Sequence, residues 1–280
     1  MEDIFKEASI KKEKLHREFA ELPETIITGV VGARDAVGNK RGAGKVPGDE
    51  YWSLKLSLIA WKELGKKINN SPLIFSNDLT YSELKLIQDH VERESLVQFK
   101  VKLSKESPFG DARAQLLSIL DTPDDIELKA ALEKYKEPVE VTHPEFGVLV
   151  LDRSLDCFEG TINWQGEPVE LSVSVDEEDG SISSSLKTIE ALYSQSGDWS
   201  KKIADYAVSE LLEVMNKNWL EGEKEFTASD FINSMELLFI TVYPDGKFEF
   251  CHDDGDMFLG HSIIISGSLT DGLSEAGISG

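Results

Sequence analysis

The feature that most constrains the fold is an alternation of apolar and polar residues in several short segments. Residues 97–103 read VQFKVKL, with an apolar side chain at every second position, and residues 52–60 read WSLKLSLIA with nearly the same pattern. A period of two places these apolar side chains on one face of a β-strand, whereas a helix needs a period of 3.6. Both segments therefore predict strands with one buried face, and we expect 52–61 to form a single long strand.

The first 120 residues combine one amphipathic helix with several such strands. Residues 2–22 carry apolar side chains at spacings of three and four and are followed by Pro23, which predicts a helix that ends there. The predicted strands are 25–31, 52–61, 73–75, 96–103 and 112–120, with a helix at 81–91 and a Gly-rich loop at 32–48. Five strands with one helix between the third and the fourth is the order of an OB-type barrel.

The remaining residues predict a second domain with a different architecture. We place the boundary before Asp121, where a charged helix at 121–137 begins. The other predicted elements are strands at 139–142, 148–151, 157–164, 169–175, 237–243, 247–252 and 261–267, and helices at 182–193, 199–219 and 228–235. The fold class is therefore α+β. An OB-like five-stranded barrel occupies residues 1–120, and an antiparallel sheet with packed helices occupies residues 121–280.

Charge is distributed unevenly between the two predicted domains. Residues 1–120 contain 19 Lys and Arg against 18 Asp and Glu, whereas residues 121–280 contain 10 against 34. A field of this sign repels nucleic acid and anionic membranes and attracts basic proteins, although solubility alone would also explain it. The densest part of the charge is a run of four carboxylates, Asp176, Glu177, Glu178 and Asp179. We expect this run to form part of an acidic surface that binds a basic protein partner.

Cysteine content and hydropathy predict a cytoplasmic protein without a membrane segment. Cys157 and Cys251 are the only cysteines, and both lie in apolar, strand-like segments. The first residues are charged throughout, unlike a secretory signal. The uncharged run 257–270 is too short and too rich in Gly and Ser to span a bilayer.

The loop 32–48 is rich in glycine and basic residues but lacks the spacing of a nucleotide-binding P-loop. Five residues separate Gly38 from Gly44, and Val46 stands where Ser or Thr would bind magnesium. Loops of OB-type barrels often contact RNA, so its basic side chains are candidate anion contacts, although the charge of the whole chain argues against nucleic acid. These candidates are Arg34, Lys40, Arg41 and Lys45.

The segment 252–261, HDDGDMFLGH, is the densest cluster of metal-ligand side chains in the sequence. Asp254, Asp256 and His261 would converge on one divalent ion if a turn between two strands brought them together. The alternative is an acidic connector, in which the Asp carboxylates accept hydrogen bonds from turn amides and His261 is fixed by packing. The sequence leaves both interpretations open.

Several C-terminal segments resemble a bacterial family of uncharacterised domains. They are 143–152 (HPEFGVLVLD), the strand 158–164, 244–250 (PDGKFEF) and 254–264 (DGDMFLGHSII), the last matching a recurring Asp-x-Asp-x-Phe-x-Gly-His-x-Ile motif. The resemblance covers residues 137–280, and the N-terminal part is similar to a separate uncharacterised domain that can precede it. It implies no activity, cofactor or catalytic residues. Leu259 departs from the aromatic residue that the family usually carries there, which favours a structural role for this position.

The sequence contains no recognisable catalytic spacing, such as a Gly-x-Ser-x-Gly elbow or a His-Glu-x-x-His helix. We therefore favour a non-enzymatic, protein-binding function in the bacterial cytoplasm, with the acidic C-terminal domain engaging a basic partner and the barrel as an accessory domain. An immunity-like role is suggested by analogy of class. The alternatives are metal-assisted hydrolysis at Asp254, Asp256 and His261, and RNA binding through the 32–48 loop. No cofactor is predicted.

Overall fold

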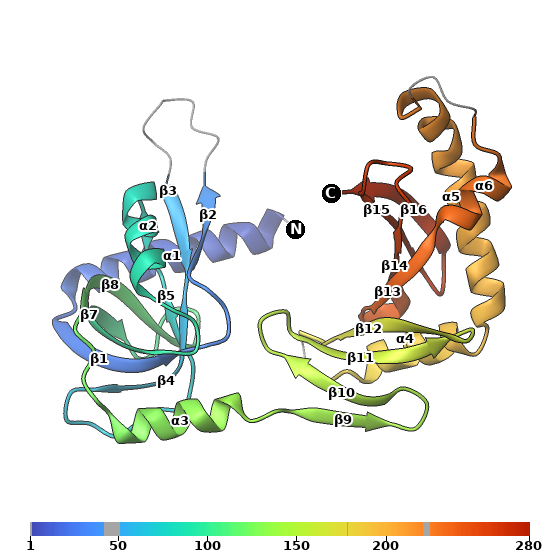
Figure 1. The fold of residues 1–280 in the computed structure, drawn as a ribbon. Helices are drawn as coiled ribbons and strands as arrows, with labels where there is room; N and C mark the ends of the chain where they lie inside the picture. Colours follow the sequence, from blue (N-terminus) through green and yellow to red (C-terminus); the bar gives the residue numbers. More distant parts are fainter. Residues whose placement is uncertain (1, 42–50, 178, 221–224) are drawn as a thin grey trace. The chain divides into compact units, whose positions relative to one another are not determined.

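The computed structural model describes residues 2–41, 51–177, 179–220 and 225–280. The chain forms two compact units, residues 1–137 and 138–280 (Figure 1). Within the described residues, no helix is long and apolar enough to cross a membrane.

The N-terminal unit is built around a closed barrel of five strands. Their order is β1-β4-β5-β8-β7, and the ring closes because β7 also pairs with β1. The pairs are antiparallel except β5 with β8, which run parallel. The barrel elements are β1 (Glu24–Val31), β4 (Ser57–Glu63), β5 (Leu73–Phe75), α2 (Tyr81–His90), β7 (Leu96–Ser104) and β8 (Ala112–Leu120). Helix α2 follows the third barrel strand, so the OB-like prediction is confirmed.

Alternating side chains fill the barrel interior as the sequence predicts. Phe99 and Leu58 are fully buried there, and the Phe75 ring packs edge-on against Phe99 with centroids 5.4 Å apart. Thr80 caps helix α2 through a capping box, because it accepts the Glu83 N–H while the Glu83 carboxylate accepts the Thr80 N–H. Buried aromatic and aliphatic side chains of this kind supply most of the stability of a small barrel.

The predicted long strand at 52–61 is wrong, because two strands stand in its place. The chain leaves β3 (Tyr51–Lys55) at Leu56 and continues as β4, which pairs with different neighbours. Strand β3 belongs to a second, three-stranded sheet with β2 (Val37–Arg41) and β6 (Asp78–Leu79). Apolar and polar residues alternate without interruption from β3 into β4. The sequence pattern alone therefore does not show that the two strands pair with different neighbours. Strand β2 also occupies part of the segment predicted as a loop at 32–48.

Two helices pack on the outside of the barrel. Helix α1 (Glu2–Glu21) buries Leu15 and Phe19 completely or nearly so. Helix α3 (Ile126–Lys136) buries Leu128 and Leu132 in a cluster with Val30 of β1 and Ala60 of β4. The compact unit therefore extends to Glu137, whereas the sequence places the boundary before Asp121. The apolar side of α3 is visible in the sequence, but no local pattern shows that this side packs against the barrel.

The C-terminal unit is built on a single eight-stranded sheet. Its order is β16-β15-β14-β13-β12-β11-β10-β9, so two meanders meet at the centre. The central pair, β12 with β13, is parallel, and all other pairs are antiparallel as predicted. The strands are β9 (Glu140–His143), β10 (Gly147–Asp152), β11 (Cys157–Trp164), β12 (Glu167–Ser174), β13 (Glu236–Val242), β14 (Lys247–Asp253), β15 (Ser262–Ser268) and β16 (Gly272–Ser279). Strand β16 was not predicted.

Helices connect the two parallel strands and pack on one face of the sheet (Figure 1). They are α4 (Ser183–Tyr193), α5 (Ser196–Asn218) and α6 (Ala228–Ser234). Ile203 and Leu211 of α5 join Leu171, Ile240 and Phe250 of the sheet in one buried cluster. Successive side chains along each strand point alternately to this covered face and to the opposite face.

Candidate functional site

The register of the C-terminal sheet fixes which side chains lie on the face that its helices leave uncovered. One row of directly paired residues on that face runs Glu159, Ser172, Thr241, Glu249, Ser266 and Glu275. The neighbouring row runs Thr161, Glu170, Phe239, Cys251 and Ile264. Both rows alternate with core positions such as Leu171 and Ile240, so they point away from the helices. We call the surface formed by these two rows the open face.

The open face is acidic, and its carboxylates lack cationic partners among the described residues. Glu159, Glu170 and Glu275 are exposed and Glu249 is half-buried. Across the described part of the chain, none of the four forms an ion pair with Lys, Arg or His. Neighbouring strands lie about 4.8 Å apart, so Glu159 and Glu249 are separated by about 14 Å along their row. Phe239, 38% exposed, adds an apolar contact between them. This combination suits a ligand that carries several positive charges.

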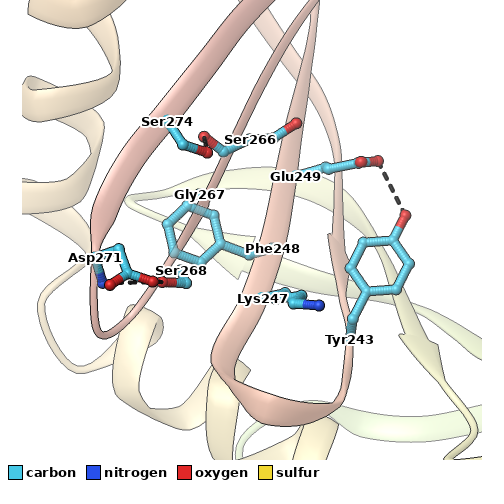
Figure 2. Close-up of a pocket in the computed structure, with 9 residues that line it drawn as sticks. All are labelled: Tyr243, Lys247, Phe248, Glu249, Ser266, Gly267, Ser268, Asp271 and Ser274. Carbon is cyan, nitrogen blue, oxygen red and sulfur yellow. Dashed lines mark hydrogen bonds between the residues drawn. The ribbon is translucent and has the colours of Figure 1, made fainter. Parts of the chain in front are cut away.

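One end of the open face is hollowed into a pocket of about 440 Å³ on β14, β15 and β16, shown in Figure 2. Tyr243 donates its hydroxyl hydrogen to Glu249 Oε2 over 3.0 Å. Burial, helped by this carboxylate, raises the pKa of Tyr243 to about 12. The phenol therefore remains a donor to the Glu249 carboxylate at alkaline pH values where an ordinary tyrosine has lost its proton. Asp271 and Lys247 contribute one further charge of each sign to the lining.

The predicted acidic run lies in the connection between β12 and α4. The Asp176 N–H donates to the Ser181 carbonyl over 2.8 Å, and the Asp179 carboxylate accepts the Ser181 N–H over 2.8 Å. This second bond lowers the pKa of Asp179. Glu177 and Asp179 are exposed, Asp176 is half-buried, and Glu178 lies outside the described residues. The run thus adds negative charge to the surface, and Asp179 also stabilises the turn.

In the predicted metal cluster, Asp254 and His261 bind the backbone of a tight turn. Asp254 is 1% exposed, and its carboxylate accepts the N–H groups of Asp256, Phe258 and Gly260 at 3.1, 2.6 and 3.3 Å. His261 Nδ1 donates to the Phe258 carbonyl over 2.6 Å, and Asp256 is exposed. Among the residues that the structure describes, no group of three His, Cys, Asp or Glu could hold a metal ion. These contacts agree with the turn-stabilising interpretation of the cluster.

The candidate anion contacts of the N-terminal unit are described only in part. Arg34 and Lys40 are exposed and make further interactions, whereas the side chain of Arg41 and the whole of Lys45 lie outside the described residues. OB-type barrels bind oligonucleotides on the face of their second and third strands. Here α3 covers the second strand, β4, and Lys62 of that strand pairs with Asp125 over 2.6 Å. Part of the surface that RNA would use is therefore occupied.

Sequence reasoning missed the open face as a site. The alternation in KFEFCHD at 247–253 separates Glu249 from the buried Phe248 and Phe250, so one signal was present. The parallel pairing of β12 with β13 was not predictable, and it is this pairing that places Glu159 and Glu249 in one row.

The fold and this surface define the class of the protein: a two-domain α+β protein with an OB-like barrel and an acidic sheet covered by helices on one face. Residues 143–278 match the family model described as "Uncharacterized protein conserved in bacteria (DUF2262)", and residues 11–135 match "Domain of unknown function (DUF7021)". These two matches confirm the predicted resemblance to uncharacterised domains, of which the C-terminal one is conserved in bacteria. No curated protein and no solved structure matches it.

Proposed function

We propose that the C-terminal unit binds a basic segment of a partner protein through the open face. The observation that carries the proposal is the row in which Glu159, Glu249 and Glu275 have no cationic partner among the described residues and lie on a face that the unit's helices leave uncovered. The charge of the whole unit supports it, because residues 138–280 contain seven Lys and Arg against 28 Asp and Glu. Such a field accelerates the approach of a basic partner.

Exposed apolar side chains on the same face give the partner a second kind of contact. Phe239, Val148 and Val150 are each at least 38% exposed. Protein interfaces combine apolar contacts of this kind with a polar rim. An immunity-like role, with a basic toxin as the partner, is one form of this function. The OB-like barrel then acts as an accessory domain in the cytoplasm.

The test compares two triple variants that remove the same number of charges from different surfaces. Glu159→Gln, Glu249→Gln and Glu275→Gln neutralise the open face, whereas Asp198→Asn, Asp205→Asn and Glu210→Gln neutralise exposed positions of α5. The measurement is fluorescence anisotropy of Lys- and Arg-rich peptides at several salt concentrations. We expect the open-face variant to weaken binding about tenfold or more and to reduce its salt dependence.

The α5 variant is the matched control, and we expect it to retain most of the affinity. Equal losses of peptide affinity in both variants would show that binding depends on the overall charge of the protein and not on the open face. The absence of binding by the unmodified protein at low salt would reject the proposal outright.

A further inference from the structure

A second concave site lies on the helix-covered side of the C-terminal unit. It is a groove of about 690 Å³ at the beginning of the parallel strands β12 and β13, with residues of α5, α6 and β14 also in its walls. Pockets for small molecules typically fall within about 300–1,000 Å³. The groove therefore has the size of a ligand site, and it shares none of its lining with the open face.

The floor of the groove contains a buried side chain without a hydrogen-bond partner. His252 is 8% exposed, and its Nδ1 makes no hydrogen bond to any atom of the residues that the structure describes. It stands on β14 between Leu237 and Ile263, on the same face as the core residue Phe250. Burial lowers the pKa of His252 to about 4, against smaller effects of nearby backbone groups, so the ring is neutral at neutral pH. A buried polar atom of this kind normally has a partner, and the groove beside the ring has room for a ligand that supplies one.

The charges around the groove indicate the sign of that ligand. Glu167 and Glu236 are exposed in its lining, and no Lys or Arg is among the described residues that line it. The surrounding unit is also strongly acidic, so an anionic ligand would be repelled. A cation, in contrast, finds two carboxylates at the groove.

The distance between the two polar parts of the groove indicates the shape of the ligand. Glu167 belongs to β12 and His252 to β14, so they are separated by two strand spacings, or about 10 Å. Val169, Leu237 and Ile203 provide apolar surface in the same lining. A ligand that reaches both parts therefore needs an apolar stem with a polar group at each end, of which the buried one is uncharged because His252 is neutral and desolvated.

We propose that this groove binds a small organic cation whose ammonium or guanidinium group lies at Glu167 and Glu236 and whose uncharged amide or hydroxyl group hydrogen-bonds His252. This site goes beyond the proposed protein-binding function and does not depend on it. The buried imidazole selects the uncharged end of the ligand, and the two carboxylates select the charged end.

The test uses three probes that separate the two ends: aminohexanamide, hexylamine and hexanamide. Binding to the full chain is measured by NMR, through the shift of the His252 ring signal and of signals in β12 and β14. We expect aminohexanamide to bind most tightly. His252→Leu should weaken it about tenfold and leave hexylamine nearly unchanged, whereas Glu167→Gln with Glu236→Gln should weaken both amines about tenfold.

Further variants keep the test decisive. His252→Gln retains a hydrogen-bonding group and should keep most of the affinity for aminohexanamide, and the exposed Glu236→Gln change avoids the core if His252→Leu fails to fold. The open-face triple variant should bind all probes as the unmodified protein does, which separates this proposal from the previous one. Hexanamide binding as tightly as aminohexanamide, or no binding of any probe, would overturn it.

Discussion

Tyr243 and Glu249 are joined across the β13–β14 turn by a 3.0 Å hydrogen bond in which the phenol donates to the carboxylate. Burial and the neighbouring charge raise the pKa of Tyr243 from 10.0 to about 12. At pH values between these two pKa values, Tyr243 is protonated in the folded chain and ionised in the unfolded chain. The free energy of unfolding therefore falls as pH rises through this window. The bond therefore has a measurable signature at alkaline pH.

The first prediction concerns this signature. In an ultraviolet titration of the folded protein, we expect one tyrosine to ionise about two pH units above the ordinary value, and Tyr243→Phe should remove that step. Glu249→Gln should move the step to lower pH while leaving burial in place. A titration of Tyr243→Phe that is identical to that of the unmodified protein above pH 10 would contradict the assignment.

The second prediction concerns acid stability and His252. Its pKa of about 4 lies below the ordinary value of 6.5, so the unfolded chain binds the extra proton first as pH falls. The contribution of His252 is fully present above pH 6.5 and is lost progressively down to about pH 4. A shift of this size corresponds to roughly 3 kcal/mol.

Chemical unfolding at several pH values checks this. We expect His252→Gln to show a shallower decline in unfolding free energy between pH 6.5 and 4 than the unmodified protein. Carboxylates that titrate in this pH range are present in both proteins, so their effect on the unfolding free energy cancels when the two declines are compared. Parallel declines would mean that His252 titrates normally in the folded state, which the NMR titration of its ring would then confirm.

The third prediction concerns Asp254, whose carboxylate accepts three backbone N–H groups in a buried turn. Asp254→Ala leaves these donors without a partner, and we expect it to lower the unfolding free energy by about 2–4 kcal/mol. Asp256→Asn is the control, because an exposed Asn tolerates the left-handed backbone at this position, where φ is 65°. Its effect should stay within about 0.5 kcal/mol.

The same proteins discriminate between the turn and metal interpretations of this cluster. If the carboxylate serves the turn, added divalent ions should leave the melting temperature of the unmodified protein unchanged. A rise that grows with metal concentration and disappears in Asp254→Ala would instead establish a metal site, since a ligand that binds only the folded state stabilises it by mass action.

Local sequence signals predicted most of the elements but not all of their partners. A Thr227–Asp230 capping box begins α6, which forms where the sequence predicts a helix at 228–235, and Pro244–Gly246 forms the turn between β13 and β14. Capping and turn chemistry act within a few residues, so a single sequence contains the whole signal. The change of partner at Leu56 and the parallel pairing of β12 with β13 depend on residues far apart in the chain, and no local pattern encodes them.

The candidate sites show the same limit. Asp254 and His261 lie in one short segment, and their residue types left a metal site and a turn-stabilising role both open; the turn geometry directs both side chains toward the backbone. Glu159 and Glu249 are distant in sequence and become members of one row only after the sheet has formed. His252 was visible as a residue type, but its burial beside a groove follows from the packing of α5 and α6.

The last prediction tests to which unit helix α3 belongs. Leu128 is fully buried against Val30 and Ala60 of the barrel, and Leu128→Ala should destabilise the N-terminal unit by about 2–5 kcal/mol. Ile126→Ala on the same helix is the control, because Ile126 is 83% exposed and its removal should cost less than about 0.5 kcal/mol. Hydrogen exchange of the full chain, followed by mass spectrometry, reports on each unit separately. We expect Leu128→Ala to accelerate exchange in β1 and β4 and to leave β11 and β12 unchanged, because the helix stabilises only the unit against which it packs. Faster exchange in β11 and β12 with an unchanged barrel would place α3 in the second domain, as the boundary before Asp121 requires.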